Sequence, residues 1–94
     1  MIPIDQKTPQ ELQEELAQRV RARRKEMRFS QEKLAKKAQV SLGSLKRFEG
    51  TGEISLVSLT KLAVALRCEQ DIEALFARKQ YLSIQDVIDE QSKS

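Results

Sequence analysis

Residues 30–49, SQEKLAKKAQVSLGSLKRFE, contain two short amphipathic patterns separated by a tight turn. One helix is expected to begin after Ser30 and another after Ser41, because serine is a favourable N-cap residue. The apolar positions of the stretch are Leu34, Ala35, Ala38, Val40, Leu42, Leu45 and Phe48. Two helices that pack near a right angle need a small side chain where they touch, and Ala35 meets that need. The stretch therefore predicts a helix-turn-helix motif.

A longer helix is expected before this motif. Thr8-Pro9-Gln10-Glu11 has the form of a capping box with proline at the first helical position, where its missing N–H costs nothing. Apolar residues then recur at near-helical spacing, at Leu12, Leu16, Val20 and Met27. Together these features predict one helix from about Pro9 to Met27.

Two more helices are expected after the motif. Gly50-Thr51-Gly52 should break the chain, and Ser55 should then open a fourth helix. Its apolar stripe is formed by Leu56, Leu59, Leu62, Ala63 and Leu66. A fifth helix is expected over residues 69–79, with Ile72, Leu75 and Phe76 as its apolar residues. Residues 83–86 resemble another capping box before Val87 and Ile88, and 81–84 is a candidate for a short extended piece.

The chain length suits one small domain with a modest core. It has 94 residues, of which 39% are hydrophobic, and a chain this short leaves much of its surface exposed after folding. We expect an all-α, five-helix domain over residues 9–79, preceded by an N-terminal arm (1–8) and followed by a C-terminal extension and tail (80–94).

Charge is distributed unevenly along the chain. Residues 1–18 sum to −3, residues 19–47 to +9, residues 48–67 to 0 and residues 68–94 to −3. The central block holds eleven basic and two acidic residues. A compact cationic block between acidic ends is typical of a protein in which one face meets a polyanion.

The composition argues against several classes of function. A single Cys68 cannot form an intrachain disulfide, and without histidine no zinc site or catalytic triad that needs one can be built, so we expect no metal, no cofactor and no enzyme. Asp86, Asp89 and Glu90 are better explained as a solvated helix end than as a catalytic pair. No apolar run approaches the roughly 20 residues of a membrane span, and MIPIDQKTPQ does not resemble a signal peptide. A cytoplasmic protein that does not contact the membrane is predicted.

The second helix of the motif would present one edge to a DNA major groove. On a helical wheel Leu42, Leu45 and Phe48 cluster on the inner side, and Gly43 and Arg47 lie opposite them. Arg47 is the one side chain there able to make a bidentate contact with guanine. The expected base-contact edge comprises Ser41, Leu42, Gly43, Ser44, Lys46 and Arg47. Because Gly43 has no side chain to read a base, we expect modest direct specificity supplemented by DNA shape.

Phosphate contacts are expected around the same motif. Gln31 follows the N-cap of the first motif helix and is placed to donate its amide to a phosphate, beside the free N–H groups of that helix end. The other candidates for phosphate contact are Arg21, Ser30, Lys36 and Thr51. For any one lysine or arginine, the competing interpretation is an ordinary solvated helix face.

Residues 20–66 resemble the phage repressor and Cro class of helix-turn-helix proteins, the XRE-like bacterial regulators. The resemblance is carried by SQEKLAKKAQVSLGSLKRFEGTGEISLVSLTKLAVAL, with its Ser-Gln start, Leu-Ala, Val-Ser turn, Phe-Glu ending and leucine-rich fourth helix. It implies a five-helix domain that binds operator DNA as a two-fold dimer, with Gln31 and Ser41 on phosphates and Leu42, Gly43 and Arg47 at the bases. It also implies an ion pair between Arg24 and Glu49 that is structural and links the first and third helices.

The chain departs from that family pattern in two places. Gln39 stands where the turn usually has glycine, and a left-handed conformation there would cost about 1–2 kcal/mol. Gly43 replaces the usual polar base reader. The sequence around residues 41–53 also resembles regulators encoded beside HipA-type kinases, and is similar in kind to HipB-type antitoxins.

Two hypotheses of different classes follow. The first is a dimeric, sequence-specific regulator of transcription that acts on double-stranded DNA, most simply as a repressor. The second is a protein-binding module, either an antitoxin that holds a kinase-like toxin or an adaptor. In this hypothesis the acidic C-terminal segment binds the partner. The apolar residues after the fourth helix could pair two subunits or fold back on their own domain: Ile72, Leu75, Phe76, Leu82, Ile84, Val87 and Ile88.

Overall fold

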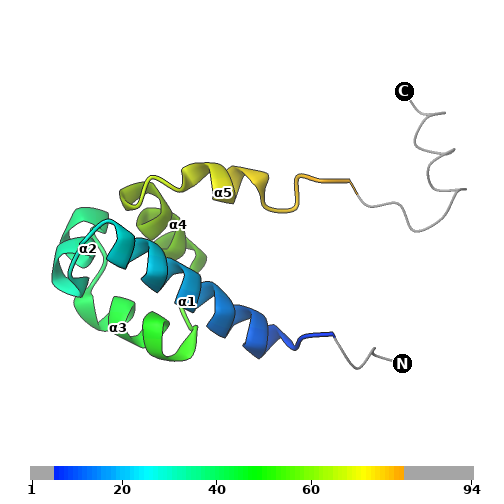
Figure 1. Ribbon diagram of the computed structural model, residues 1–94, viewed down its shortest axis with the longest axis horizontal. Coiled ribbons are helices and arrows are strands. Elements are labelled where there is room, and N and C mark those ends of the chain that lie inside the picture. The colour runs from blue at the N-terminus through cyan, green and yellow to red at the C-terminus, as the bar shows by residue number, and fades with distance from the viewer. Residues whose placement is uncertain (1–5, 80–94) are drawn as a thin grey trace, which may run out of the picture.

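The computed structural model describes residues 6–79, and it folds them into five α-helices (Figure 1). The helices are α1 (Pro9–Glu26), α2 (Gln31–Ala38), α3 (Leu42–Thr51), α4 (Leu56–Ala65) and α5 (Glu69–Ala74). No strand occurs in these residues, so the all-α prediction is confirmed for this part of the chain. Most of the predicted N-terminal arm (1–5), the whole C-terminal extension (80–94) and the predicted last short helix lie outside the described residues.

The first four helices begin where the sequence predicts. Thr8 and Glu11 form a complete capping box, in which each side chain accepts a hydrogen bond from the other's backbone N–H at 3.1 Å. Ser30, Ser41 and Ser55 each accept from the backbone N–H three residues further on, at 3.0 to 3.1 Å. Each cap satisfies one of the N–H groups that a helix start leaves without an intrahelical partner.

The helix ends that flank α3 use left-handed residues. Gln39 closes α2 with φ 58° and ψ 44°, the conformation anticipated from the missing glycine in the turn. Gly50 and Thr51 continue α3, so the predicted break over 50–52 is wrong for these two and occurs only at Gly52, with φ 85°. A Cβ atom at Gly52 would lie 2.9 Å from the backbone carbon of Gln13, which means that this turn requires glycine on two counts.

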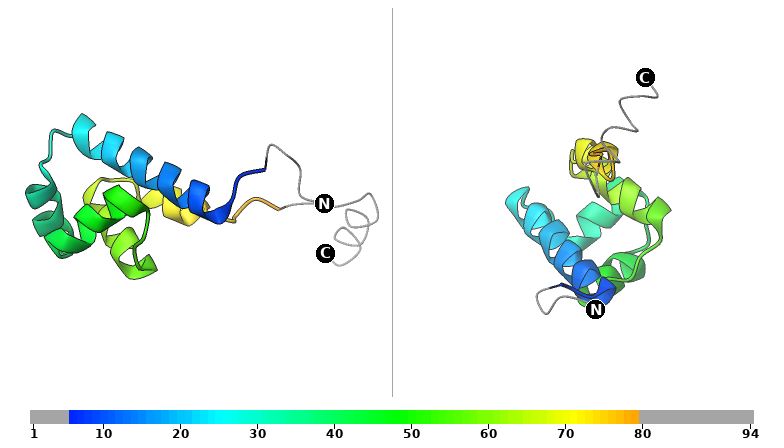
Figure 2. Two further views of the ribbon diagram at one scale, coloured as in Figure 1. Left: turned by 90° about the horizontal axis from the view of Figure 1, so that it is seen from below. Right: turned by 90° about the vertical axis from the view of Figure 1, so that its right-hand side faces the viewer.

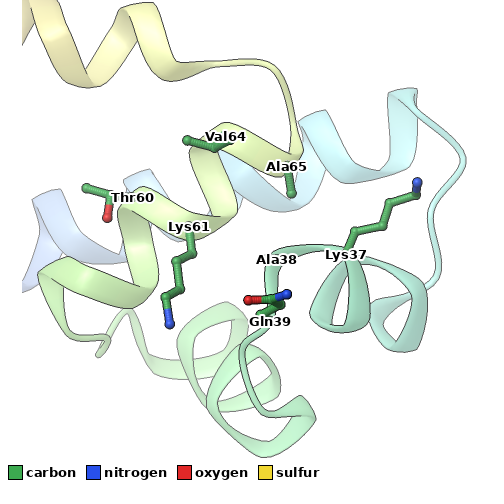
Figure 3. Close-up of a pocket in the computed structure, with 7 residues that line it drawn as sticks. All are labelled: Lys37, Ala38, Gln39, Thr60, Lys61, Val64 and Ala65. Carbon is green, nitrogen blue, oxygen red and sulfur yellow. The ribbon is translucent and has the colours of Figure 1, made fainter.

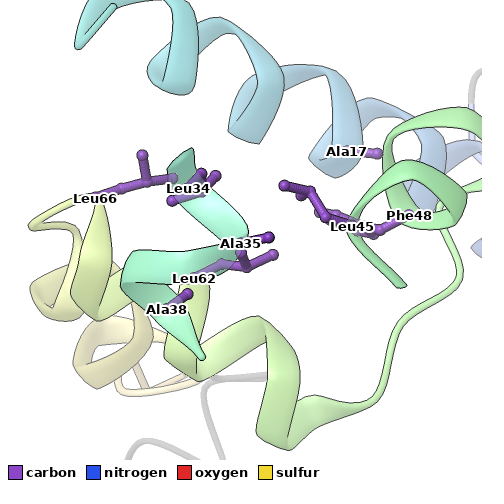
Figure 4. Close-up of a cluster of buried hydrophobic side chains, with 8 residues drawn as sticks. All are labelled: Ala17, Leu34, Ala35, Ala38, Leu45, Phe48, Leu62 and Leu66. Atoms are coloured by element: carbon purple, nitrogen blue, oxygen red, sulfur yellow. The ribbon is translucent and has the colours of Figure 1, made fainter. Parts of the chain in front are cut away.

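The core lies between α1, α2, α3 and α4 (Figure 4). α1 contacts α3, while α2 contacts both α3 and α4, and α5 contacts α4. The buried cluster comprises Ala17, Leu34, Ala35, Ala38, Leu45, Phe48, Leu62 and Leu66. Figure 2 shows α1 lying across α3 as one long helix, with α2 at one end of the pair. The small side chain of Ala35 is buried, as the close approach of α2 to its neighbours requires.

Three sequence-based placements differ from the structure. Leu12 and Leu56 were expected on apolar stripes but are 53% and 67% exposed, because each lies in the first turns of its helix, outside the buried cluster. The fifth helix ends at Ala74 and not at Lys79. Leu75 is extended and Phe76 is left-handed with φ 59°. This helix packs mainly against α4, and a short helix with little tertiary support is marginal.

No helix within residues 6–79 has both the length and the apolar content needed to span a bilayer.

Candidate nucleic-acid interface

The outer edge of α3 is open to solvent. Gly43, Lys46 and Arg47 are exposed, whereas Leu45 and Phe48 on the opposite side have no exposed surface. Two fully buried side chains thus fix the rotation of α3 about its own axis. A ligand that approaches from outside would meet a rigid helix that presents two cationic side chains.

Gly43 leaves the backbone of this edge uncovered. A Cβ atom built at this position would meet nothing within 4 Å. The glycine is therefore not required by packing or by the backbone, unlike Gly52. Its consequence is that a ligand can approach the first turn of α3 more closely than a larger side chain would allow.

Two of the predicted base-contact residues are less open to solvent than the others. Leu42 is half-buried and packs against the core, so only part of its side chain faces outward. Ser44 is also half-buried, and its backbone N–H is bonded to the Ser41 hydroxyl at 3.0 Å. The exposed edge consequently consists of Ser41, Gly43, Lys46 and Arg47.

Arg47 has a partner that the sequence did not reveal. Its Nε and Nη2 atoms both donate to Oε2 of Glu53, at 2.9 and 2.5 Å. The Arg47 side chain nevertheless keeps 68% of its surface exposed. Residues six apart do not share a helix face, and the two meet because the chain reverses at Gly52. To predict this contact from the sequence, one would have had to recognise both the chain reversal at Gly52 and the acidic residue, Glu53, that follows it.

The serine caps of α2 and α3 remain available to a ligand. Ser30 and Ser41 use an oxygen lone pair to accept from the backbone, which leaves each hydroxyl hydrogen free to donate. Both side chains are exposed and stand beside the first N–H groups of a helix. Such a position favours an anion through local hydrogen bonds and the helix dipole.

Gln31 and Thr51, two predicted phosphate ligands, make internal hydrogen bonds. The Gln31 amide donates to Oε1 of Glu49 at 2.9 Å, which leaves one amide hydrogen for an external acceptor. The Thr51 hydroxyl donates its only hydrogen to the Arg47 carbonyl at 2.8 Å and accepts from the Glu53 N–H at 3.1 Å. Thr51 thus serves the end of α3, and its hydroxyl cannot also donate to a phosphate.

Arg24 and Glu49 form a buried bidentate ion pair between α1 and α3. Arg24 Nε lies 2.8 Å from Glu49 Oε2, and Arg24 Nη2 lies 3.0 Å from Oε1. A third Arg24 nitrogen, Nη1, donates to the Phe29 carbonyl at 2.8 Å. The side chains are 10% and 5% exposed. The pair is placed to hold α1 against α3, and neither charge is presented to a ligand.

The remaining basic residues divide by their surroundings. Arg21 and Lys36 are exposed, as a phosphate contact would require. Lys33 and Lys37 place their ammonium groups 5.1 and 5.5 Å from the Phe29 ring centre, in cation–π geometry. Arg23 donates to Glu26 at 3.1 Å, and this carboxylate raises the pKa of Arg23. Glu49 and Glu53, which lie outside the +9 block, pair with Arg24 and Arg47 inside it, so two of its charges are offset within the chain.

A shallow, mainly apolar hollow of about 290 Å³ lies between α2 and α4 (Figure 3). It is lined by Lys37, Ala38, Gln39, Thr60, Lys61, Val64 and Ala65. Exposed apolar side chains continue along α4 from this hollow, since Val64 is 62% and Val57 is 63% exposed. This surface is separate from the outer edge of α3 and was not singled out by the sequence.

The predicted site residues therefore do not all lie together. Ser41, Gly43, Lys46 and Arg47 lie together on the outer edge of α3, whereas Gln31 lies with the Arg24–Glu49 pair. No protein-family model and no curated protein matches this chain.

Proposed function

We propose that this protein is a sequence-specific DNA-binding regulator of transcription, in which α2 and α3 form a repressor-like helix-turn-helix and α3 enters the major groove. The single observation that carries the proposal is the outward edge of α3, with Gly43, Lys46 and Arg47 exposed above buried Leu45 and Phe48. A helix of this kind offers donors that fit the acceptor pattern of guanine while its inner face stays anchored.

Positioning on the duplex is assigned to the helix starts. Ser30 and Ser41 can each donate a hydroxyl hydrogen to a phosphate, and the remaining amide hydrogen of Gln31 can do the same. Exposed Arg21 and Lys36 supply further positive charge. A plot of the logarithm of the binding constant against the logarithm of the salt concentration should fall, with a slope of about −0.9 for each phosphate contact.

The protein is proposed to act as a homodimer that represses transcription in the cytoplasm. Two copies related by a two-fold axis would place their α3 helices about 34 Å apart, one turn of DNA. Exposed Leu75 and Phe76, which follow α5, support self-association through this end of the described chain.

Selection of bound sequences from a random DNA pool tests the proposal directly. Recovery of a two-fold symmetric site, followed by an anisotropy titration with that duplex at low salt, is the expected result. The protein's own upstream region serves as a second probe. Absence of binding to both, with a correctly folded protein, would rule the proposal out.

Two variants separate base reading from positioning. Arg47→Ala should lower affinity for the selected site by about 10- to 100-fold, because a bidentate contact with guanine is lost, and should change nonspecific affinity far less. Gln31→Ala should weaken specific and nonspecific binding to a similar extent, since the contact with DNA assigned to Gln31 is to a phosphate and not to a base. If Arg47→Ala weakened binding to every sequence equally, Arg47 would not be a base reader.

A second candidate function is a protein-binding module, such as an antitoxin or an adaptor that binds a kinase-like toxin. The observation that favours it is the apolar surface along α4, with its hollow beside α2. Co-purification with the product of a neighbouring gene, lost in Val64→Glu but kept in Arg47→Ala, is the expected result. A lone dimer in native mass spectrometry would count against it. Both functions can reside in one chain, since they use different surfaces.

A further inference from the structure

The guanidinium of Arg47 is held along one edge only. Nε and Nη2 both donate to Glu53 Oε2, so two of the five guanidinium hydrogens are used. The second hydrogen on Nη2 and both hydrogens on Nη1 are not part of this contact. The end of the guanidinium formed by Nη1 and Nη2 therefore still offers two parallel donors, which is the geometry that matches O6 and N7 of guanine.

The position of Glu53 is set by the backbone and does not depend on the ion pair alone. Gly52 reverses the chain in a conformation that excludes a Cβ atom, and the Thr51 hydroxyl binds both the Arg47 carbonyl and the Glu53 N–H. The Gln10 amide of α1 in turn donates to the Thr51 carbonyl at 3.1 Å. Glu53 is thus directed toward Arg47 by contacts that reach into α1.

We propose that Glu53 is a positioning residue that orients Arg47 for end-on contact with one guanine. This inference rests on the proposed DNA-binding function and adds the source of its base specificity. The carboxylate occupies the side edge of the guanidinium, which leaves the end-on edge for the base. Its negative charge also disfavours a phosphate at the same place, so Arg47 is kept from the DNA backbone.

The test compares Glu53→Ala with Glu53→Gln. Both variants remove the negative charge, but glutamine keeps an oxygen that can accept from Arg47. Affinities are measured by anisotropy for the selected duplex, for the same duplex with the contacted guanine replaced, and for unrelated DNA. Thermal melting followed by circular dichroism establishes that each variant is folded.

If Glu53 orients Arg47, then Glu53→Ala and Glu53→Gln should differ in their effect on the preference for the contacted guanine. Glu53→Ala should reduce the preference for the contacted guanine by at least about threefold, up to the roughly 100-fold of a complete bidentate contact. Glu53→Gln should reduce it less. Nonspecific affinity should be unchanged or higher in both, because a negative charge near the DNA has been removed. Glu32→Gln, which neutralises another exposed acidic residue, is the matched control and should leave the base preference unaltered.

A double variant completes the test. In an Arg47→Ala background, Glu53→Ala should have no further effect on base preference, because the residue that it orients is gone. Equal loss in both backgrounds would overturn the inference, since Glu53 would then act on the base directly. Identical behaviour of the alanine and glutamine variants would also overturn it, because charge alone would explain the effect. Wild-type protein without any sequence preference would instead overturn the proposed function itself.

Discussion

Single residues with left-handed backbones set the shape of this chain at several helix ends. Arg28, Gln39, Arg67 and Phe76 have φ between 58° and 60°, although none is glycine. Left-handed conformations are strained for residues with a Cβ atom. At Gln39 the strain is offset by two hydrogen bonds, from the Gln39 N–H to the Lys36 carbonyl and from the Val40 N–H to the Ala35 carbonyl.

Gln39→Gly should therefore stabilise the protein, by up to about 1 kcal/mol, because the backbone strain is removed. Gly52→Ala is the opposite case and should destabilise it by more than about 1 kcal/mol, since the new Cβ atom would overlap the Gln13 backbone. Urea unfolding followed by circular dichroism measures both changes. A loss of stability in Gln39→Gly would show that the glutamine side chain makes a contribution larger than the strain.

Glu11 carries the most direct pH dependence at the residue scale. Hydrogen bonds from the Thr8 backbone and hydroxyl hold the pKa of the Glu11 carboxyl below its usual value. A carboxyl group whose pKa is lower in the folded protein than in the unfolded chain stabilises the folded state at any pH above the unfolded-state pKa. This contribution is lost as the pH falls through the folded-state pKa. The melting temperatures of wild type and Glu11→Gln should thus differ at pH 7 and converge in acid. In a Thr8→Ala background the difference should shrink only in part, because the backbone N–H of residue 8, the larger cause of the shift, still donates to Glu11.

At the scale of elements, a buried ion pair joins α1 to α3, while a second, exposed pair closes the end of α3. Arg24–Glu49 and Arg47–Glu53 each use Nε and Nη2 of the arginine, but their surroundings differ. The first pair is almost fully buried and the second is more than half exposed. A buried charge that loses its partner is costly, whereas an exposed one is returned to water.

Glu49→Ala should accordingly cost roughly 3–5 kcal/mol, because Arg24 would be left buried without a counter-charge. The double variant Arg24→Met, Glu49→Leu should cost less than this single variant, since no charge remains buried. The matched exposed pair provides the control, and Arg47→Ala or Glu53→Ala should each change stability by less than about 1 kcal/mol. If the changes in the free energy of unfolding caused by Arg24→Met and by Glu49→Leu simply added in the double variant, as measured by urea unfolding, this account would be contradicted.

At the scale of the whole molecule, a small core leaves apolar side chains outside it. Phe76 is 94% exposed and Leu75 is 55% exposed beyond α5, and a separate exposed group lies on α4. Contiguous exposed apolar residues on a small protein commonly mark surfaces that meet a partner. Under the proposed function, these two groups provide separate surfaces, one for a second subunit and one for another protein.

Phe76→Glu should weaken dimerisation by about tenfold or more, since burial of a phenylalanine contributes about 1.5–3 kcal/mol. Val64→Glu introduces the same charge on α4 and should leave the dimer intact. Size-exclusion chromatography with light scattering over a range of concentrations measures both. A dimer that survives Phe76→Glu but is lost in Val64→Glu would place the subunit contact on α4.

The local features of this fold could be predicted from the sequence. Thr8, Ser30, Ser41 and Ser55 cap the helices that they were expected to cap, and Leu45 and Phe48 are the buried anchors of α3. Caps and apolar periodicity act over three or four residues, so they are already encoded in a short window of sequence. The same holds for the outward position of Gly43 and Arg47.

What only the tertiary structure decided lies between segments. Four features depend on which elements pack together. They are the exposure of Leu12 and Leu56, the early end of α5, the internal bonds of Gln31 and Thr51, and the contact of Glu53 with Arg47. Gly52 illustrates the reason, because its left-handed turn brings together two side chains that no helical repeat would pair. Local hydrogen bonding determined where the first four helices begin, and packing between helices determined which of their side chains a ligand can reach.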